Sequence, residues 1–158
     1  MTSTSVGFHF RPVPVSRSLR AVAGLSVNDV RAAVRAALAE DVGTGDVTTL
    51  ACIPPQATAR AMIRTRESVV VCGLDLAEAA FREWSPNVGV QRAVTDGARL
   101  NPGQTLLTVS GSARAILTAE RVALNFLQRL SGVATLTSHY VDAIRGTRAR
   151  ILDTRKTT

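Results

Sequence analysis

Ala59-Arg60-Ala61-Met62-Ile63-Arg64, followed closely by Val69-Val70-Val71-Cys72, is the stretch that decides the fold of this 158-residue chain. The first segment alternates, with Arg60 and Arg64 on one face, which is typical of a half-buried strand. The second segment is continuously apolar and short, which is typical of a buried strand. We therefore predict strand, brief turn and strand over residues 57–72.

The residues after this stretch predict one helix and two more strands. Leu74, Ala77, Phe81 and Trp84 recur at helical spacing, which predicts a helix with these side chains in the core. Strands are predicted over 88–94 and 105–109. Turn signals separate them at Asp96-Gly97 and Asn101-Pro102-Gly103.

The residues before this stretch predict a helix from Ser26 to Glu40. Ser26 is a suitable cap, Asp29 lies in the first turn, and apolar residues recur every three or four positions. The glycines of Asp41-Val42-Gly43-Thr44-Gly45-Asp46 resemble a phosphate loop, but no strand precedes them, so we interpret the segment as a helix stop. Together these elements predict an α+β domain over residues 26–116.

A further helix is predicted from Thr118 to about Ser131, with a continuation to Ile144 left open. Its apolar face comprises Val122, Phe126, Leu130 and Val133. A polar stripe comprises Arg121, Asn125, Gln128 and Gly132. Such a stripe is either a solvated face or a surface directed at a partner or a site.

The last residues combine a predicted strand with two adjacent cations. Ala149-Arg150-Ile151-Leu152 follows a turn signal and reads as a strand. It leads to Arg155 and to Lys156, the only lysine among nineteen positive side chains. Guanidinium suits carboxylate and ammonium suits phosphate, so the pair indicates an anionic substrate carrying both groups. The alternative is a basic tail in solvent.

Charge and composition exclude several classes of protein. The net charge of +7 resides at the ends, because residues 26–144 contain eleven bases and eleven acids. With six aromatic residues there is no stacking array, so we expect no nucleic-acid partner. No apolar run approaches ~20 residues, so we expect no membrane span. Cys52 and Cys72 have no metal-site spacing and are expected to be small buried residues in a reducing cytoplasm.

Residues 1–25 contain three arginines, several serines and no acid. A transit peptide has this composition, and so does a disordered extension. We favour a disordered extension because the apolar positions show no amphipathic period.

Three motif blocks carry a resemblance to a known family. They are Glu40–Thr48, then Glu120–Asn125 together with Leu130–Thr135, and finally Asp153-Thr154-Arg155-Lys156-Thr157-Thr158. In this order and at these intervals they closely resemble the quinolinate phosphoribosyltransferases, also called nicotinate-nucleotide pyrophosphorylases (carboxylating). The resemblance runs from about residue 26 to 158 and covers the amino-terminal half of the family's longer chain.

The resemblance implies a fold and a domain organisation. Residues 1–25 would be the disordered extension, residues 26–116 an α/β sandwich domain, and residues 117–158 the start of a truncated α/β barrel phosphoribosyltransferase domain. The chain would then be an α+β sandwich amino-terminal domain followed by the first helix and first strand of an incomplete α/β barrel. We expect residues 145–158 to be weakly anchored.

The resemblance also implies an activity: transfer of phosphoribosyl from phosphoribosyl pyrophosphate to quinolinate with decarboxylation, giving nicotinate mononucleotide for NAD biosynthesis. Arg155 would bind a quinolinate carboxylate. Lys156 would be catalytic and substrate-binding, and Arg121 would reach the site of the partner subunit in a homodimer or higher oligomer. Mg²⁺ is implied as cofactor, but its ligands have no counterpart here, so no metal-binding residue is assigned.

Two alternatives remain at this point. A molybdenum-locus homologue of the same superfamily would share the motif blocks and use another substrate. A truncated chain could instead be a non-catalytic dimerisation domain, pairing through the helix of residues 118–144. In either case we expect the 158-residue chain alone to be inactive.

Overall fold

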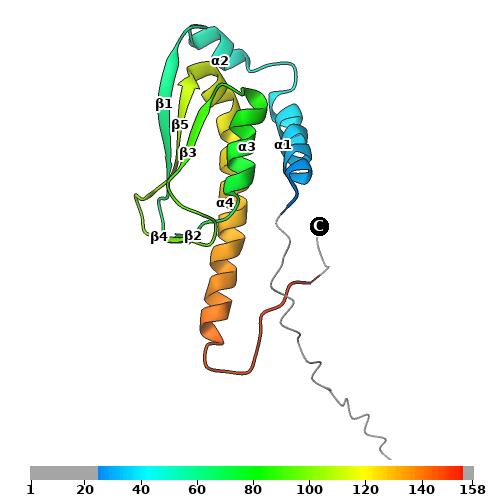
Figure 1. The fold of residues 1–158 in the computed structure, drawn as a ribbon, viewed down its shortest axis with the longest axis vertical. Helices are drawn as coiled ribbons and strands as arrows, with labels where there is room; N and C mark the ends of the chain where they lie inside the picture. Colours follow the sequence, from blue (N-terminus) through cyan, green and yellow to red (C-terminus); the bar gives the residue numbers. More distant parts are fainter. Residues whose placement is uncertain (1–24, 155–158) are drawn as a thin grey trace, which may run out of the picture.

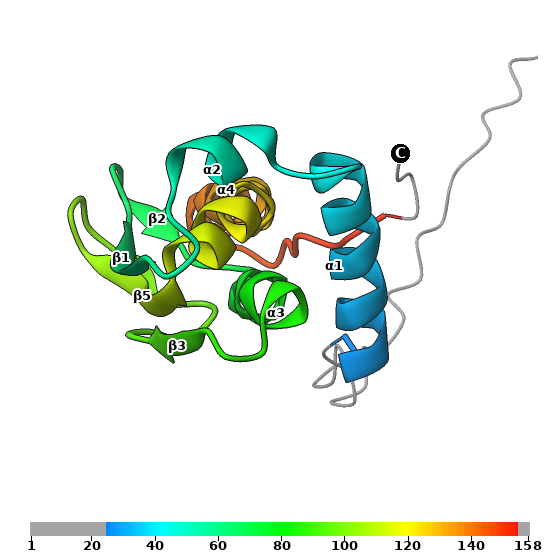
Figure 2. The same ribbon diagram turned by 90° about the horizontal axis from the view of Figure 1, so that it is seen from above.

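A computed structural model describes residues 25–154 of the chain. The elements, in chain order, are α1 (Val27–Val42), α2 (Val47–Cys52), β1 (Thr58–Arg64), β2 (Val69–Val70), α3 (Leu74–Trp84), β3 (Gly89–Arg92), β4 (Arg99–Leu100), β5 (Thr105–Ser112) and α4 (Ala113–Ala143). They form three layers, with the larger sheet on one side, α3 and α4 in the middle and α1 outside them (Figures 1 and 2).

Two antiparallel sheets form the β part of the molecule. The larger has the order β1-β5-β3, with Ala61 opposite Val109 and Val90 opposite the same residue from the other side. The smaller pairs β2 with β4. The strands predicted over 57–72, 88–94 and 105–109 are confirmed, whereas the two-residue β4 was not predicted because turn signals surround it.

The core lies between the larger sheet and the helices. Leu107 and Val109 of β5 are buried, and so are Phe81 of α3 and Ala119 of α4. The alternation of β5 directs Leu107 and Val109 towards the helices. Side chains of the larger sheet and of the helices therefore form one hydrophobic cluster.

The predicted start and end of the first helix are confirmed. The Ser26 side chain accepts a hydrogen bond from the N–H of Asp29, and the Asp29 carboxylate accepts one from the N–H of Ser26 in return. This capping box satisfies donors that the first helical turn leaves unpaired. Gly43 ends the helix with a positive φ of 52°, which only glycine adopts at low cost.

β2 pairs with a strand on one side, and on the other side hydroxyl groups of α4 supply the hydrogen-bond partners. The N–H of Val70 donates to Thr135 Oγ1, and the N–H of Cys72 donates to Ser131 Oγ. Ser131 Oγ also donates to the carbonyl of Cys72. The segment at the end of β2 is therefore hydrogen-bonded to β4 on one side and to a helix on the other.

Three elements differ from what the sequence predicted. α2 was not predicted, because its six residues were too few to show a period. α4 begins at Ala113, five residues before the predicted start, and its unbroken run to Ala143 confirms the continuation that the sequence left open. Residues 149–152 are not a strand, because no neighbouring strand among residues 25–154 offers hydrogen-bond partners. Ile151 and Leu152 are instead exposed.

Burial also differs from the prediction at particular side chains. Trp84 was expected in the core and Val133 on the apolar face of its helix, but they are 41% and 61% exposed. Cys52 is exposed and Cys72 half-buried, so only Cys72 approaches the expected buried thiol. Burial raises the pKa of the Cys72 thiol, and Asp96 acts in the same direction. Between residues 25 and 154 no helix is long and apolar enough to cross a membrane.

Candidate functional site

Arg121 lies near the amino-terminal end of α4 and contacts the end of α1. Its Nη1 atom is 3.1 Å from Asp41 Oδ1. The arginine side chain is 73% exposed, whereas that of Asp41 is 21% exposed. A guanidinium has five N–H donors, so this single contact orients Arg121 while leaving donors for another carboxylate.

A second contact joins the same two segments of the chain. Asp46 Oδ1 accepts a hydrogen bond from the N–H of Thr49 and so caps α2, while Asp46 Oδ2 accepts one from the hydroxyl of Thr118 on α4. Hydrogen bonds from Thr49 hold the pKa of Asp46 below its ordinary value, and Thr118 and Arg121 act in the same direction. Asp46 is therefore a stable anion that anchors the loop.

These contacts bring together two of the three motif blocks. The block of residues 40–48 meets the block that begins at Glu120 through Asp41 and Arg121, 80 positions apart, and Asp46 bonds to Thr118 just before the second block. The helix-stop interpretation of residues 41–46 holds, because both carboxylates have structural partners. Sequence reasoning missed Asp41, Asp46 and Thr118 as neighbours of Arg121, although both carboxylates stand in the motif block.

A groove of about 430 Å³ lies between α1 and α4 beside this cluster. Ala37, Glu40 and Asp41 line it from α1, and Asn125, Phe126 and Arg129 line it from α4. All four residues of the polar stripe, Arg121, Asn125, Gln128 and Gly132, are exposed. The groove has two carboxylates against the single guanidinium of Arg129, a poor match for a dianionic ligand. Arg121 is better placed to act on a molecule outside this groove.

The remaining predicted site residues, Arg155 and Lys156, lie outside the described residues. Asp153 and Thr154 of their motif block are described and exposed. The structure thus brings two motif blocks together and leaves the placement of the third as a prediction. Within residues 25–154 no group of three or more His, Cys, Asp or Glu side chains could hold a metal ion.

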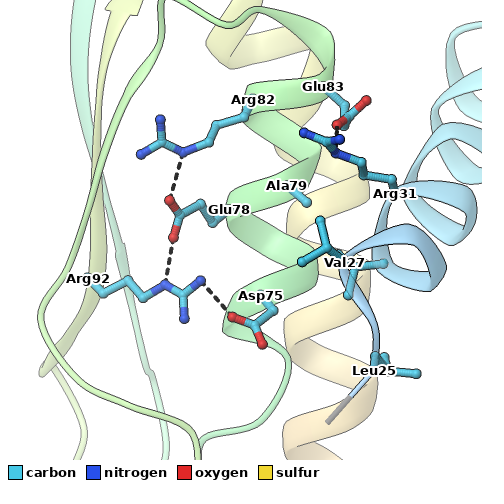
Figure 3. Close-up of a pocket in the computed structure, with 10 residues that line it drawn as sticks. Leu25, Val27, Arg31, Asp75, Glu78, Ala79, Arg82, Glu83 and Arg92 are labelled. Atoms are coloured by element: carbon cyan, nitrogen blue, oxygen red, sulfur yellow. Dashed lines mark hydrogen bonds and ion pairs between the residues drawn. The ribbon is translucent and has the colours of Figure 1, made fainter.

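A second hollow lies between α1 and α3, and a network of ion pairs lines it (Figure 3). Glu78 accepts from Arg82 at 2.7 Å and from Arg92 at 2.6 Å, and Arg92 also contacts Asp75 at 2.8 Å. Burial acts to raise the pKa of Glu78, but the two arginines outweigh it and hold that pKa below the ordinary value. Because its charges neutralise one another, this hollow is a structural feature.

Comparison with known proteins gives consistent results. A family model described as "Quinolinate phosphoribosyl transferase, N-terminal domain" matches residues 46–131. The nicotinate-nucleotide pyrophosphorylase (carboxylating) of Mycobacterium leprae is 46% identical over 130 residues, covering 80% of this chain and 46% of the relative. A chloroplastic enzyme of the same name from Arabidopsis thaliana is 44% identical, covering 82% of this chain and 37% of the relative.

Solved structures show the same likeness. The nicotinate-nucleotide pyrophosphorylase of Francisella tularensis matches with a TM-score of 0.78 and 36% identity, over 83% of this chain and 47% of that one. NadC from Streptococcus pyogenes matches with a TM-score of 0.80 and 39% identity, over 85% and 49%. The chain therefore spans less than half the length of these relatives.

Proposed function

This chain belongs to the quinolinate phosphoribosyltransferase family, and on that premise we propose that it supplies the amino-terminal half of an enzyme that joins quinolinate to phosphoribosyl pyrophosphate. The reaction forms a bond between the pyridine nitrogen and C1 of the ribose as the bond to pyrophosphate breaks. The bond between the ring and one carboxylate then breaks, carbon dioxide leaves, and the ring carbon takes a proton. The product is nicotinate mononucleotide, a precursor of NAD.

The observation that carries this proposal is that Arg121 is exposed and is paired with one carboxylate. Quinolinate has two carboxylates on a flat ring, and arginine binds such groups with paired hydrogen bonds. Arg121 is 73% exposed and is held by one carboxylate, that of Asp41. Asp41 thus keeps the guanidinium oriented while its remaining donors stay accessible. Because the neighbouring groove is rich in carboxylate, we propose that Arg121 serves the site of a partner subunit in a homodimer or higher oligomer.

Arg155 and Lys156 have the complementary roles in the proposal. Arg155 binds a quinolinate carboxylate in its own subunit, and Lys156 contacts the phosphoribosyl donor or the bound acid. Fixed positive charge of this kind stabilises the anion that develops on the ring carbon as carbon dioxide leaves. The described residues do not provide a magnesium site, so no step here is assigned to the metal.

A two-domain chimera provides the test. It joins residues 1–158 to the half of the M. leprae relative that lies outside the match. We expect the chimera to release pyrophosphate only when quinolinate and phosphoribosyl pyrophosphate are both present, and the 158-residue chain alone to release none. Arg121→Ala should lower turnover strongly. Arg35→Ala is the matched control, because Arg35 is 68% exposed and is paired with Glu83.

Two results would refute the proposal. One is a folded chimera that releases no pyrophosphate with quinolinate, and the other is an Arg121→Ala variant as active as the Arg35→Ala control. Turnover with another acid in place of quinolinate would favour the molybdenum-locus homologue. The curated relatives reported above are named for nicotinate nucleotide and the matching family model is named for quinolinate, which favours the pyridine substrate.

A second candidate function, a non-catalytic pairing domain, is favoured by one observation. Val133, Leu136, Tyr140 and Val141 of α4 are large, apolar and exposed. A domain that pairs through α4 without binding ligand should show no heat of binding when quinolinate is titrated into the chimera. Binding of quinolinate that Arg155→Ala weakens would exclude this candidate.

A further inference from the structure

Asp41 lies in the last turn of α1, where the backbone around it is fixed. The helix ends in a hydrogen bond from the N–H of Gly43 to the carbonyl of Ala39. The Asp41 side chain is 21% exposed, whereas that of its partner Arg121 is 73% exposed. An arginine side chain also has more rotatable bonds than an aspartate, so it has more freedom to lose. Asp41 is therefore the better-ordered member of the pair.

The loop that follows Asp41 contacts α4 a second time. The Asp46 carboxylate accepts a hydrogen bond from the hydroxyl of Thr118 at 3.1 Å, and the same carboxylate caps α2. Thr118 and Arg121 are neighbours on the surface of α4, because residues three positions apart lie on one side of a helix. The loop connects α1 to α2 at the end of the molecule where α4 begins (Figure 1). Two contacts with α4 thus fix the position of Asp41 relative to Arg121.

The position of Asp41 is unfavourable for the helix that contains it. The carboxyl-terminal end of a helix has partial negative charge, so cations are favoured there and anions are not. The last turn of α1 contains Glu40 and Asp41 and no basic residue. Residues that break a local rule of this kind are expected at functional sites. The contact that Asp41 makes in return is the ion pair with Arg121.

This ion pair leaves one edge of the guanidinium free. Asp41 Oδ1 contacts Nη1 of Arg121. The Nε and Nη2 atoms of Arg121 have no hydrogen-bond partner among residues 25–154. These two nitrogens share one edge of the planar group and can donate parallel hydrogen bonds to the two oxygens of one carboxylate. The paired arginine is therefore ready for two-pronged binding of an anion.

We propose that Asp41 is a positioning residue, which holds Arg121 so that its Nε–Nη2 edge receives a carboxylate of the substrate in the partner subunit's site. The identity of that substrate rests on the proposed function. An arginine that is ordered before binding avoids the loss of side-chain freedom that binding otherwise requires. In this arrangement Asp41 does not touch the substrate and acts only through Arg121.

Two effects of Asp41 on anion binding have opposite signs. Its negative charge lowers the positive potential around Arg121 and so weakens the binding of an anion. Its orienting effect strengthens that binding. Because Arg121 is 73% exposed, water and salt screen the charge effect, and the orienting effect should be the larger. Removal of Asp41 should therefore raise KM for quinolinate, whereas a pure charge effect would lower it.

The first experiment uses the 158-residue chain and requires no activity. Nitrogen-15 relaxation of the arginine Nε–H groups measures the ps–ns mobility of each side chain. Arg121 should be more ordered than the exposed Arg129, which has no ion pair among residues 25–154. Asp41→Ala should make Arg121 as mobile as Arg129. Asp41→Asn keeps an acceptor oxygen and should give an intermediate value. Asp75→Ala is the matched control, because it removes a carboxylate from Arg92 and should leave Arg121 unchanged.

The second experiment uses the two-domain chimera and compares its two substrates. Asp41→Ala should raise KM for quinolinate about two- to tenfold, which is the effect of ordering one long side chain on binding. KM for phosphoribosyl pyrophosphate should not change. In the Arg121→Ala background the same substitution should have no further effect, because the residue through which Asp41 acts is then absent. Asp75→Ala should change neither KM.

Each contrary result has a definite meaning. The inference is overturned if Arg121 is as mobile as Arg129 in the unsubstituted chain, or if Asp41→Ala lowers KM for quinolinate or leaves it unchanged. Equal rises of both KM values, together with a Tm lower by more than a few degrees, would assign Asp41 a structural role only. A folded chimera that does not use quinolinate refutes the proposed function instead. For an inactive or unfolded chimera, the mobility of Arg121 in the 158-residue chain decides the inference by itself.

Discussion

At Arg121 the proposed function can be tested separately from the stability of the fold. Its guanidinium is 73% exposed and meets Asp41 at 3.1 Å. An exposed ion pair of this kind contributes at most about 1 kcal/mol to the free energy of unfolding. Loss of Arg121 should therefore leave the fold intact. A large effect of the substitution on turnover would be an effect on the site.

The first prediction tests whether Arg121 serves the partner subunit. In the chimera, Arg121→Ala and Arg155→Ala should each lower turnover by roughly 30- to 1000-fold, because each loses a charge-assisted carboxylate fork worth about 2–4 kcal/mol. Mixing the two inactive proteins under subunit exchange should restore activity. In a mixed dimer both lesions fall on one site, so about a quarter of all sites become native.

Recovery is measured as pyrophosphate release after the presence of heterodimers has been verified with differently tagged subunits. A mixture of Arg121→Ala with itself is the control and should stay inactive. A verified heterodimer without recovered activity would place Arg121 in its own subunit's site or in a structural role.

Gly73 is a residue whose backbone conformation depends on the absence of a side chain. Its φ is 101°, and a Cβ atom there would lie 2.8 Å from Leu130 Cδ1 and 3.4 Å from the carbonyl oxygen of Phe126. Its N–H donates to Asp96, which also accepts from Leu74 at the start of α3. This glycine allows α3 and α4 to approach each other closely.

The second prediction is that Gly73→Ala lowers the free energy of unfolding by about 2–3 kcal/mol, through backbone strain and a steric clash. Gly97→Ala is the control, because Gly97 has a φ of 88° but open space around it. It should show the strain alone, about 1 kcal/mol. Urea denaturation measures both, and equal losses would mean that the clash with Leu130 is relieved without cost.

At the scale of elements, β2 shows how a very short strand is stabilised. It has two residues and one strand partner, β4. The N–H of Val70 bonds to Thr135 of α4, and the N–H and carbonyl of Cys72, just after the strand, bond to Ser131. Ser131 is buried, so water cannot replace its hydroxyl. The helix therefore provides the hydrogen-bond partners that a neighbouring strand would provide.

The third prediction follows from this arrangement. Ser131→Ala should lower the free energy of unfolding by about 1–3 kcal/mol, because the N–H and carbonyl of Cys72 lose their shared partner. Ser138→Ala in the same helix should have little effect, since the Ser138 hydroxyl bonds only to the carbonyl of Thr135. Amide exchange at Cys72, whose N–H donates to Ser131 Oγ, should accelerate in the first variant. Unchanged exchange there would show that the hydroxyl is dispensable.

At the scale of the whole molecule, carboxylates tie segments together across the chain. Asp46 joins α2 to α4, Glu78 bonds to two arginines, and Asp142 contacts Arg99 and Arg145. For Asp142, the hydrogen bond from Arg145 is the main cause that holds the pKa below its ordinary value. All three carboxyl groups therefore have lower pKa values in the folded protein than in the unfolded chain.

The fourth prediction is loss of stability in acid. A carboxyl group with a depressed folded pKa stabilises the fold above its ordinary pKa, here 3.8 for Asp and 4.5 for Glu. That contribution is lost as the pH falls through the lower, folded value. The urea midpoint should thus fall as the pH goes below about 4.5. Glu78→Gln should reduce this dependence, and a midpoint equal at pH 6 and 3 would contradict it.

The fifth prediction concerns residues 1–24, which lie outside the described part of the chain. Their sequence has no periodic apolar face, so their removal should leave Tm nearly unchanged. Differential scanning calorimetry of the two forms at equal concentration measures the difference. A decrease of more than a few degrees would show that the segment packs against the domain.

The sequence by itself determined the elements whose signals are local. The Ser26 cap, the alternation before Arg64 and the helical spacing after Leu74 each predicted an element that the structure contains. The ordered motif blocks determined the family in the same way, because residue identity along the chain carries that information. Burial was less predictable, since Val133 has the spacing of a core residue and yet lies past the end of the core.

Only the tertiary structure decided the contacts between distant segments. Asp41 and Arg121 are 80 positions apart, and nothing local in either segment predicts their ion pair. Local sequence also did not predict that hydroxyl groups of α4 bond to the backbone beside β2. Nor did it predict that residues 149–152 form no strand. Backbone hydrogen bonds in a strand require a neighbour, and a side-chain contact requires two elements to pack. The whole fold decides whether a pairing strand or a packed element is present, and no local sequence pattern predicts this.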